Sequence, residues 1–282
     1  MRVAVAQFRS KLGELEENIR KTVEMAREAK GRGAKLCLFP ELNLTGYNLQ
    51  DLTFEVAVRL SDPRLTPLIE LSREIALIVG LIEESSEHLF YNSALYIEGG
   101  AIKHVHRKVY LPTYGMFDEG RFTAAGNRVE VFSSLAGKSV TLICEDLWHM
   151  STVYLAFIQG ASTIFALSAS PGRGYREKEM FGNAEVWLNM GEFYSRMTGS
   201  YFIYANRVGC EDGFTFSGCS FICNPFGEVE AQASPFQEEL IYGEVKDEAV
   251  RAARISLPLL RDEKPLLTLE NLRRALNERE NF

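Results

Sequence analysis

The sequence predicts an α/β fold with two mixed sheets covered by outer helices. Three observations indicate it: a strand–helix–strand order at the N-terminus, strands paired around glycines in the middle, and a second round of strands and helices after them. No linker rich in Pro, Gly or Ser divides the 282 residues. We therefore expect one domain over residues 1–282, with residues 256–282 as a C-terminal extension.

Hydrophobic periodicity defines the elements of the first half. Arg2–Phe8 alternates like a strand, Glu14–Lys30 has apolar residues at helical spacing, and Ala34–Phe39 is a short apolar run typical of a buried strand. Gly99 and Gly100 predict the turn of a hairpin. The same criteria predict a helix over Pro67–Ile75 and strands over Ala76–Ile82, Tyr91–Glu98 and Ala101–Val109.

The second half repeats this alternation. Gly137 separates two short apolar runs, and longer helical and strand-like runs follow. We predict strands over Val129–Phe132, Ser139–Cys144, Ser162–Leu167, Tyr201–Val208, Cys219–Cys223 and Leu240–Val245, and helices over Thr152–Gln159, Glu177–Met197 and Asp247–Ile255.

Composition and charge argue against several classes of protein. The net charge of −7, without a run of five like charges, offers no basic surface for a phosphate backbone, so we expect no nucleic-acid partner. No segment approaches the ~18 apolar residues of a membrane helix, and MRVAVAQF is too short for a secretion signal. Five cysteines without CxxC spacing favour free thiols in a reducing, cytoplasmic compartment.

The sequence carries no recognisable metal or cofactor motif. His104 and His106 lie two apart on an expected strand, but no third ligand is evident nearby, so we expect an exposed strand face instead. No glycine loop of the kind that cradles phosphate is evident. We therefore expect activity without a metal or an organic cofactor.

Three reactive side chains lie where a strand is expected to end. Glu41 follows a buried strand in LCLFPEL, Lys108 closes a hairpin strand in HVHRKVYLP, and Cys144 ends an apolar strand in VTLICED. A rigid strand aims the side chain at its end, which is why catalytic groups gather there. Taken singly, each has an ordinary structural explanation: a turn residue, a solvated lysine and a small core residue.

Together the three form a complete set for attack on an amide. A thiolate from Cys144 attacks the carbonyl carbon, while Glu41 takes the thiol proton and returns it to the leaving amine. The ammonium of Lys108 and the backbone N–H of Glu145 are candidates to hold the developing oxyanion. A buried ammonium needs carboxylate neighbours, and Glu119 in YGMFDEGRF is the candidate for that role.

These segments resemble a known family. FPELNLTGY, HRKVYLPTYGMFDEGRF and LICEDLW are similar to the Glu, Lys and Cys motifs of the nitrilase or carbon–nitrogen hydrolase superfamily, in that family's order. The runs ALSASPGRG, ANRVGCEDGFTFSGCSFICNPFGEV and RAARISLPLLRD extend the likeness over nearly the whole chain. The resemblance also places a second glutamate after the lysine, which corresponds to Glu119.

The resemblance implies a fold and a mechanism. The fold would be a four-layer α-β-β-α sandwich that forms a homodimer or higher oligomer through helices of two subunits. The reaction would pass through a thioester on Cys144, release ammonia or an amine, and end with hydrolysis by a water that Glu41 activates. Glu119 would orient Lys108 and the substrate, and no cofactor would take part.

A finer resemblance points to one branch. ELNLTGYNLQDL, KVYLPTYGMFDEGRF and CEDLW are closer to the glutaminase domain of glutamine-dependent NAD synthetase than to aliphatic nitrilases. The sequence shows no SGGxDS-like nucleotide loop, so we expect a stand-alone amidase of small amides. Three alternatives stay open: a glutaminase that supplies ammonia to a separate synthetase, a binding protein without turnover, and an acyltransferase.

Residues around the expected site have lesser assignments. Tyr47, Tyr114 and Arg173 are candidates to contact substrate, because the loops that follow Tyr47, Pro112 and Pro171 should line the pocket mouth. Asp146 and the side chain of Glu145 are expected to hold the turn by hydrogen bonds. A Cys144–His149 pair is conceivable, but it ranks below Glu41 because no partner that would orient the imidazole is evident.

Overall fold

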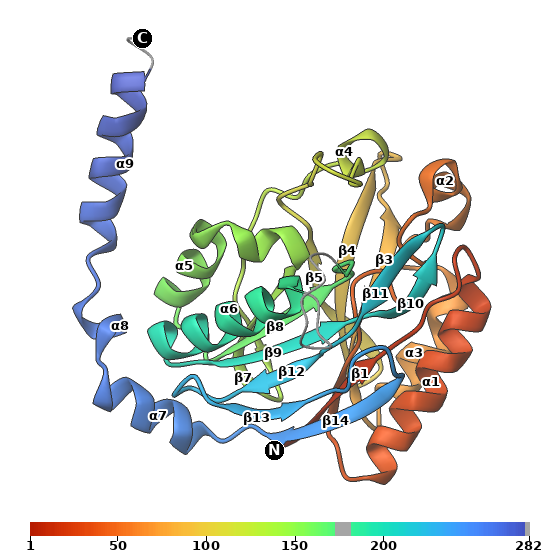
Figure 1. The fold of residues 1–282 in the computed structure, drawn as a ribbon, viewed down its shortest axis with the longest axis horizontal. Helices are drawn as coiled ribbons and strands as arrows, with labels where there is room; N and C mark the ends of the chain where they lie inside the picture. Colours follow the sequence, from red (N-terminus) through yellow and green to blue (C-terminus); the bar gives the residue numbers. More distant parts are fainter. Residues whose placement is uncertain (173–181, 280–282) are drawn as a thin grey trace.

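The computed structural model describes residues 1–172 and 182–279 and contains two six-stranded sheets (Figure 1). The first sheet has the order β14-β1-β2-β3-β4-β5. Strands β1, β2 and β3 run parallel, and the other neighbours are antiparallel. The strands are β1 (Arg2–Gln7), β2 (Leu36–Leu38), β3 (Ala76–Glu84), β4 (Phe90–Glu98), β5 (Ala101–Arg107) and β14 (Glu239–Glu244).

The second sheet has the order β13-β12-β9-β8-β7-β6, with β7, β8 and β9 parallel. Its strands are β6 (Phe132–Ser134), β7 (Gly137–Ile143), β8 (Thr163–Ser168), β9 (Tyr201–Asn206), β12 (Phe221–Cys223) and β13 (Val229–Gln232). A separate two-stranded ribbon joins β10 (Val208–Glu211) to β11 (Phe214–Ser217).

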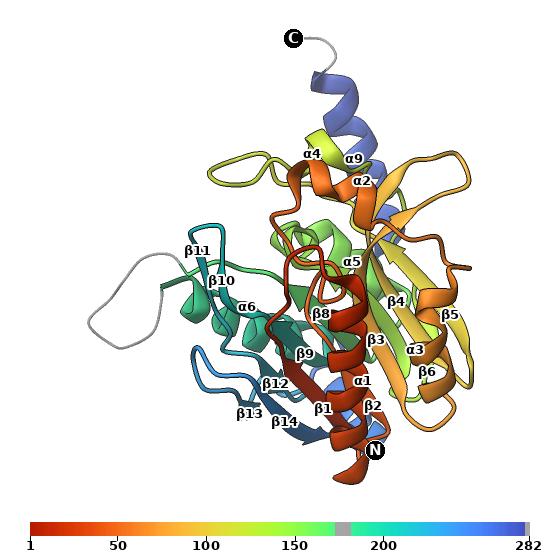
Figure 2. The same cartoon turned by 90° about the vertical axis from the view of Figure 1, so that its right-hand side faces the viewer.

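Helices cover the outer faces of both sheets (Figure 2). α1 (Leu15–Gly31) and α3 (Thr66–Leu71) lie on the first sheet, while α5 (Met150–Ile158) and α6 (Gly182–Thr198) lie on the second. The remaining helices are η1 (Gln50–Leu52), α2 (Thr53–Val56), η2 (Pro63–Leu65), α4 (Glu119–Phe122), η3 (Cys144–Trp148), α7 (Asp247–Ser256), α8 (Leu259–Asp262) and α9 (Pro265–Arg279).

Side-chain alternation in β1 explains the four layers. Val3 and Val5 pack into the core that the two sheets share. Ala4 and Ala6 point the other way and pack in the cluster that contains Ile19 of α1. Because successive strand residues face opposite sides, one apolar strand serves two cores. The predicted α-β-β-α sandwich is therefore the observed fold.

Several predicted elements differ from the structure. The strand expected over Val129–Phe132 lies at Phe132–Ser134, and the one expected over Cys219–Cys223 begins only at Phe221. The run Tyr201–Val208 splits, because β9 ends at Asn206 and β10 starts the separate ribbon. The helix expected from Glu177 is described from Gly182, since residues 173–181 lie outside the described part.

The last described residues form two helices that the sequence reading did not predict. Figure 1 shows α9 running away from the body of the fold, and none of its residues is buried. Within residues 1–172 and 182–279, no helix has the length and apolarity needed to cross a membrane.

Candidate active site

Glu41 sits in a turn directly after β2 and is fully buried. Its two carboxylate oxygens accept separate hydrogen bonds: Asn92 Nδ2 donates to Oε1 at 2.8 Å, and the backbone N–H of Ala169 donates to Oε2 at 2.8 Å. Gly80 of β3 lets this turn pass close by, since a Cβ there would lie 2.4 Å from the backbone nitrogen of Leu42. Elements of both sheets thus fix the orientation of Glu41.

Lys108 is the first residue after β5, and its side chain is completely buried. Its Nζ donates to Glu41 Oε1 at 2.8 Å and to Glu119 Oε1 at 2.7 Å. Burial by itself would lower the pKa of Lys108, but the carboxylates of Glu119 and Glu41 outweigh it and hold the pKa well above its usual value. Lys108 is therefore a fixed positive charge.

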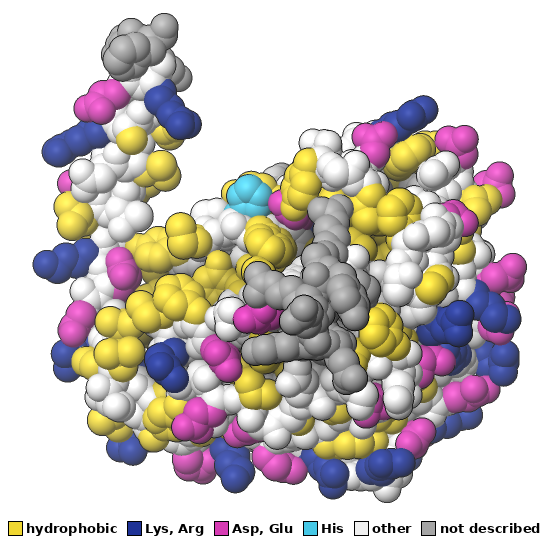
Figure 3. Space-filling view, in the orientation of Figure 1, with side chains coloured by type: hydrophobic (Ala, Val, Ile, Leu, Met, Phe, Trp, Pro, Cys, Tyr) yellow, Lys and Arg dark blue, Asp and Glu magenta, His cyan; other side chains and the backbone are white. Residues whose placement is uncertain are grey.

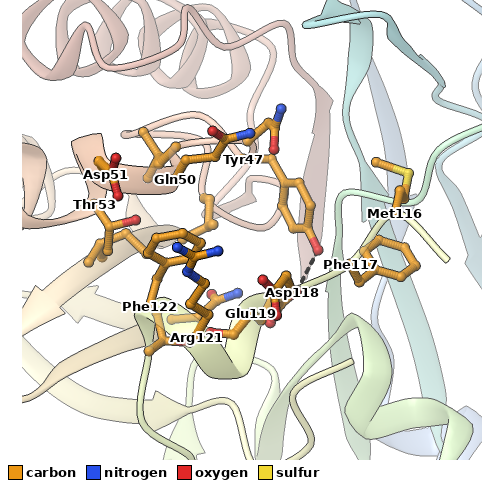
Figure 4. Close-up of a pocket in the computed structure, with 16 residues that line it drawn as sticks. Tyr47, Gln50, Asp51, Thr53, Met116, Phe117, Asp118, Glu119, Arg121 and Phe122 are labelled. Atoms are coloured by element: carbon orange, nitrogen blue, oxygen red, sulfur yellow. Dashed lines mark hydrogen bonds between the residues drawn. The ribbon is translucent and has the colours of Figure 1, made fainter. Parts of the chain in front are cut away.

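Glu119 opens the short helix α4 and reaches back toward Lys108. The hydroxyl of Tyr47 donates to the same Oε1 at 2.5 Å, a contact visible in Figure 4. Burial raises the pKa of Glu119 to about 7, against the lowering effect of Lys108 and with a further rise from Glu41. Glu119 can therefore gain or lose its charge near neutral pH.

Cys144 follows β7 and begins the tight turn of η3 with a φ of +42°. Left-handed backbone is strained for a residue other than glycine, and such strain is often found at functional positions. Cys144 is 8% exposed, and Ser168 Oγ donates to its Sγ at 3.4 Å. Burial and the charge of Glu41 raise the pKa of Cys144 well above its usual value, so the resting thiol is neutral and needs a base.

The structure thus brings the four predicted catalytic side chains into one site. Lys108 touches both glutamates, and the charges of Glu41, Lys108 and Glu119 all act on the pKa of the Cys144 thiol. A neutral thiol, a carboxylate and a fixed ammonium are the groups that nucleophilic attack on a carbonyl requires.

Asp146 joins the lysine loop to the cysteine turn. Its Oδ1 accepts the backbone N–H groups of Val109 at 2.9 Å and Tyr110 at 3.0 Å. Its Oδ2 accepts the backbone N–H of Ile143 at 3.0 Å and is 2.8 Å from His106 Nε2. Asp146 therefore contacts the residues next to Lys108 and Cys144, as the predicted structural role of this aspartate requires.

The burial of His106 shows that one expectation was wrong. We expected His104 and His106 to share an exposed strand face, but His106 is only 3% exposed because it pairs with the buried Asp146. His104 is partly buried and stacks on the ring of Phe132. Among the described residues, no group of three or more His, Cys, Asp or Glu side chains is arranged to hold a metal ion.

The other candidates occupy different positions. Tyr114 is half exposed, and its hydroxyl donates to Glu145 Oε2 at 2.9 Å. His149 stacks on Tyr110, and its Nε2 lies 4.0 Å from the carboxylate of Glu145. Arg173 lies outside the described residues.

A cavity of about 270 Å³ adjoins the glutamate side of the site (Figure 4). Tyr47 and Glu119 lie in its wall, together with Asn92, which donates a hydrogen bond to Glu41. Cys144 and Lys108 are not among its lining residues, so the walls of this cavity do not include the thiol.

Comparison with known proteins gives matches over most of the chain. The family model described as carbon–nitrogen hydrolase matches residues 2–255. The chain belongs to the carbon–nitrogen hydrolase family. It is 33% identical over 257 residues to the glutamine-dependent NAD(+) synthetase of Acinetobacter baylyi, covering 90% of this chain and 46% of that protein. The chain therefore spans less than half the length of this curated relative.

Solved structures with the same fold superpose on most of this chain. A glutamine-dependent NAD+ synthetase from Acinetobacter baumannii superposes with a TM-score of 0.80 at 31% identity, over 88% of this chain and 46% of that one. A carbon-nitrogen hydrolase from Helicobacter pylori G27 superposes with a TM-score of 0.81 at 24% identity, over 96% and 98%. An amidase of the nitrilase superfamily from Nesterenkonia AN1 gives 0.78 at 22% identity, over 96% of each chain.

The sequence analysis did not identify the residues that hold Glu41 and Cys144. Asn92, Ser168 and the N–H of Ala169 each donate to Glu41 or Cys144. One signal was available for Asn92, which is a polar residue inside the apolar run FYNSALY. A buried polar side chain in a strand needs a partner, and here the partner is Glu41.

Proposed function

We propose that this hydrolase cleaves the amide of a small molecule through a thioester on Cys144 and releases ammonia. One observation carries the proposal. Lys108 is completely buried between Glu41 and Glu119, and the charges of this cluster act directly on the Cys144 thiol. A buried cation is costly unless nearby carboxylates compensate its charge, as Glu41 and Glu119 do for Lys108. The same positive charge can stabilise a developing oxyanion.

The proposed acylation step uses these groups in turn. Glu41 takes the proton from Cys144 Sγ while the sulfur attacks the carbonyl carbon. The ammonium of Lys108 and the backbone N–H of Glu145 stabilise the oxyanion. When the tetrahedral intermediate collapses, the carbon–nitrogen bond breaks, Glu41 returns the proton to nitrogen, and ammonia leaves.

Hydrolysis of the thioester then completes the cycle. Glu41 removes a proton from water as the water oxygen attacks the thioester carbon. The carbon–sulfur bond breaks, the proton passes from Glu41 to the sulfur, and a carboxylic acid is released. Throughout the cycle Glu119 keeps Lys108 in place, and Tyr47 and Tyr114 are candidates to contact the substrate at the mouth; Arg173 stays a candidate from the sequence.

The second candidate function is that of a glutaminase that supplies ammonia to a separate synthetase. It is favoured by the likeness to proteins named glutamine-dependent NAD(+) synthetase. Ammonia release should be measured over glutamine, asparagine, other ω-amides, carbamoyl compounds and nitriles, with Cys144→Ala as the matched control. Turnover of glutamine alone favours the glutaminase, turnover of other amides favours the amidase, and no turnover favours a binding protein.

We further propose that two copies of the chain associate through α5 and α6. Apolar side chains gather on this face in Figure 3, and several are well exposed, including Met150 at 74% and Phe193 at 55%. Exposed apolar patches of this kind often mark protein interfaces. Light scattering should show a dimer or larger oligomer, and Phe193→Asp should shift it to the monomer; a wild-type monomer at micromolar concentration contradicts the proposal.

The proposed compartment is the cytoplasm. The mechanism requires Cys144 as a free thiol, and a reducing environment keeps it so. The five cysteines, Cys37, Cys144, Cys210, Cys219 and Cys223, are all free thiols in the structure. Fractionation of cells that express a tagged chain would test this location.

A further inference from the structure

The β10–β11 ribbon lies outside both sheets and reaches the loop that carries Tyr47 (Figure 1). Glu211, at the end of β10, is only 6% exposed. Its Oε1 accepts two successive backbone N–H groups, from Tyr47 at 2.9 Å and from Asn48 at 2.6 Å. A carboxylate that accepts two adjacent N–H groups fixes both the position and the direction of the backbone there.

A glycine next to Tyr47 allows the Glu211 carboxylate to approach the backbone this closely. Gly46 precedes Tyr47 with a φ of +84°, and a Cβ on it would lie 2.8 Å from the Cα of Leu12 and 3.3 Å from Glu211 Oε2. Only glycine adopts that backbone without strain and leaves room for the carboxylate.

A buried cation holds Glu211 in turn. Arg207 is 1% exposed, and its Nη2 lies 2.8 Å from Glu211 Oε2. Its guanidinium also lies 4.4 Å above the ring of Phe216, and that ring packs edge-on against the ring of Tyr47 at 6.2 Å. The ribbon thus contacts Tyr47 twice, at the backbone through Glu211 and at the ring through Phe216.

Tyr47 carries this constraint into the catalytic cluster. Its hydroxyl donates to Glu119 Oε1, the same atom that accepts Lys108 Nζ. A displacement of the Tyr47 loop would therefore alter the acceptor that holds the lysine. Positioning of this kind matters because a shift of about 1 Å can cost on the order of 100-fold in rate.

We propose that Glu211 is a positioning residue for catalysis: it fixes Tyr47 so that the tyrosine hydroxyl and Lys108 share one oxygen of Glu119. The inference rests on the proposed amidase function. Arg207 has a supporting role, because its guanidinium holds the carboxylate of Glu211 toward the loop.

A matched pair of variants tests the role of the acceptor oxygen. Arg207→Met combined with Glu211→Gln keeps an oxygen that can accept both N–H groups, whereas Arg207→Met combined with Glu211→Met removes it. Replacing Arg207 in both avoids a buried cation without a partner. If the second variant does not fold, Glu211→Asp in the wild-type background takes its place against wild type, because its shorter side chain cannot reach both N–H groups.

The expected result is a loss of kcat on the order of 10- to 100-fold in the acceptor-removing variant relative to the acceptor-keeping one. The acid limb of its pH profile should also move to higher pH, because the Tyr47 hydrogen bond lowers the pKa of Glu119. The charged groups that face Glu119 are Lys108 and Glu41, and neither is changed. In a Tyr47→Phe background the two variants should have the same kcat and the same acid limb.

Two results would overturn the inference. One is equal kcat for the two variants, and the other is a difference in kcat between them that stays unchanged in the Tyr47→Phe background. The rate of Cys144 labelling by iodoacetamide, followed against pH, gives a readout without substrate, since the charge of Glu119 acts on the pKa of that thiol. If no amide is hydrolysed, the proposed function fails, while the labelling profiles of the two variants still decide the role of Glu211.

Discussion

Replacing Asp146 by asparagine tests whether one carboxylate holds the lysine loop and the cysteine turn together. An asparagine Oδ1 can still accept the N–H groups of Val109 and Tyr110, but its amide nitrogen would face the N–H of Ile143, which loses its acceptor. An unsatisfied buried donor costs roughly 1–3 kcal/mol, and the loss of the charged acceptor for His106 adds about 1–2 kcal/mol. We expect Asp146→Asn to lower the free energy of unfolding by about 2–5 kcal/mol.

Urea denaturation followed by circular dichroism measures this loss, with an unchanged m-value as the sign that only stability has changed. The melting temperature should fall by roughly 2 to 4 °C per kcal/mol. Asp262→Asn on exposed α8 is the matched control and should leave the midpoint unchanged. The activity of Asp146→Asn should fall mainly in kcat, because the turn that carries Cys144 loses its hydrogen bond at Ile143. Unchanged stability together with unchanged kcat would refute this reasoning.

Four further outcomes are expected. Cys144→Ala should abolish turnover without unfolding the protein, and turnover by the alanine variant would contradict the assignment of Cys144 as the nucleophile. Lys108→Ala should lose ~10²–10³ in kcat, and Lys108→Arg should not restore it, because a guanidinium differs in shape and donor directions. Activity should fall as the pH drops through about 7, because protonated Glu119 holds Lys108 less well. Glu119→Gln should remove this pH dependence. If activity still fell over the same pH range, the titrating group would be a different one. Dialysis against EDTA should leave kcat unchanged, and loss restored by a divalent ion would overturn the thiol mechanism.

Much of the fold could be predicted because the signals for its main elements are local. The alternation in β1 and the helical spacing in α1 are visible in the sequence and correspond to separate cores in the structure. The sequence analysis did not predict the ribbon β10–β11, although it expected strands on either side of it. The pair Asp212–Gly213 at its tip is a hairpin signal that could have located it.

The clustering of the candidate side chains could be expected from the sequence, but the residues that hold them could not. Glu41, Lys108 and Cys144 each follow a strand, so sequence patterns locate them. The contact of Asn92 with Glu41 depends on how β4 packs beside the turn after β2, and no local pattern encodes that register. The burial of His106 was missed for the same reason, because its partner Asp146 is 40 residues away.

Backbone N–H groups in the loops that follow strands have no hydrogen-bond partner in the sheet. They need another acceptor to hold them in place. In this protein, buried carboxylates do so at three places: Glu41 for Ala169, Asp146 for Ile143 and Val109, and Glu211 for Tyr47. A buried carboxylate is costly to desolvate, but several charge-assisted hydrogen bonds offset the cost and fix direction as well as distance. Each of these residues bridges segments distant in sequence. The relative positions of Cys144, Lys108 and Tyr47 therefore depend on tertiary contacts, and a substitution at Asp146 or Glu211 should impair the proposed catalysis even though neither residue is proposed to touch the substrate.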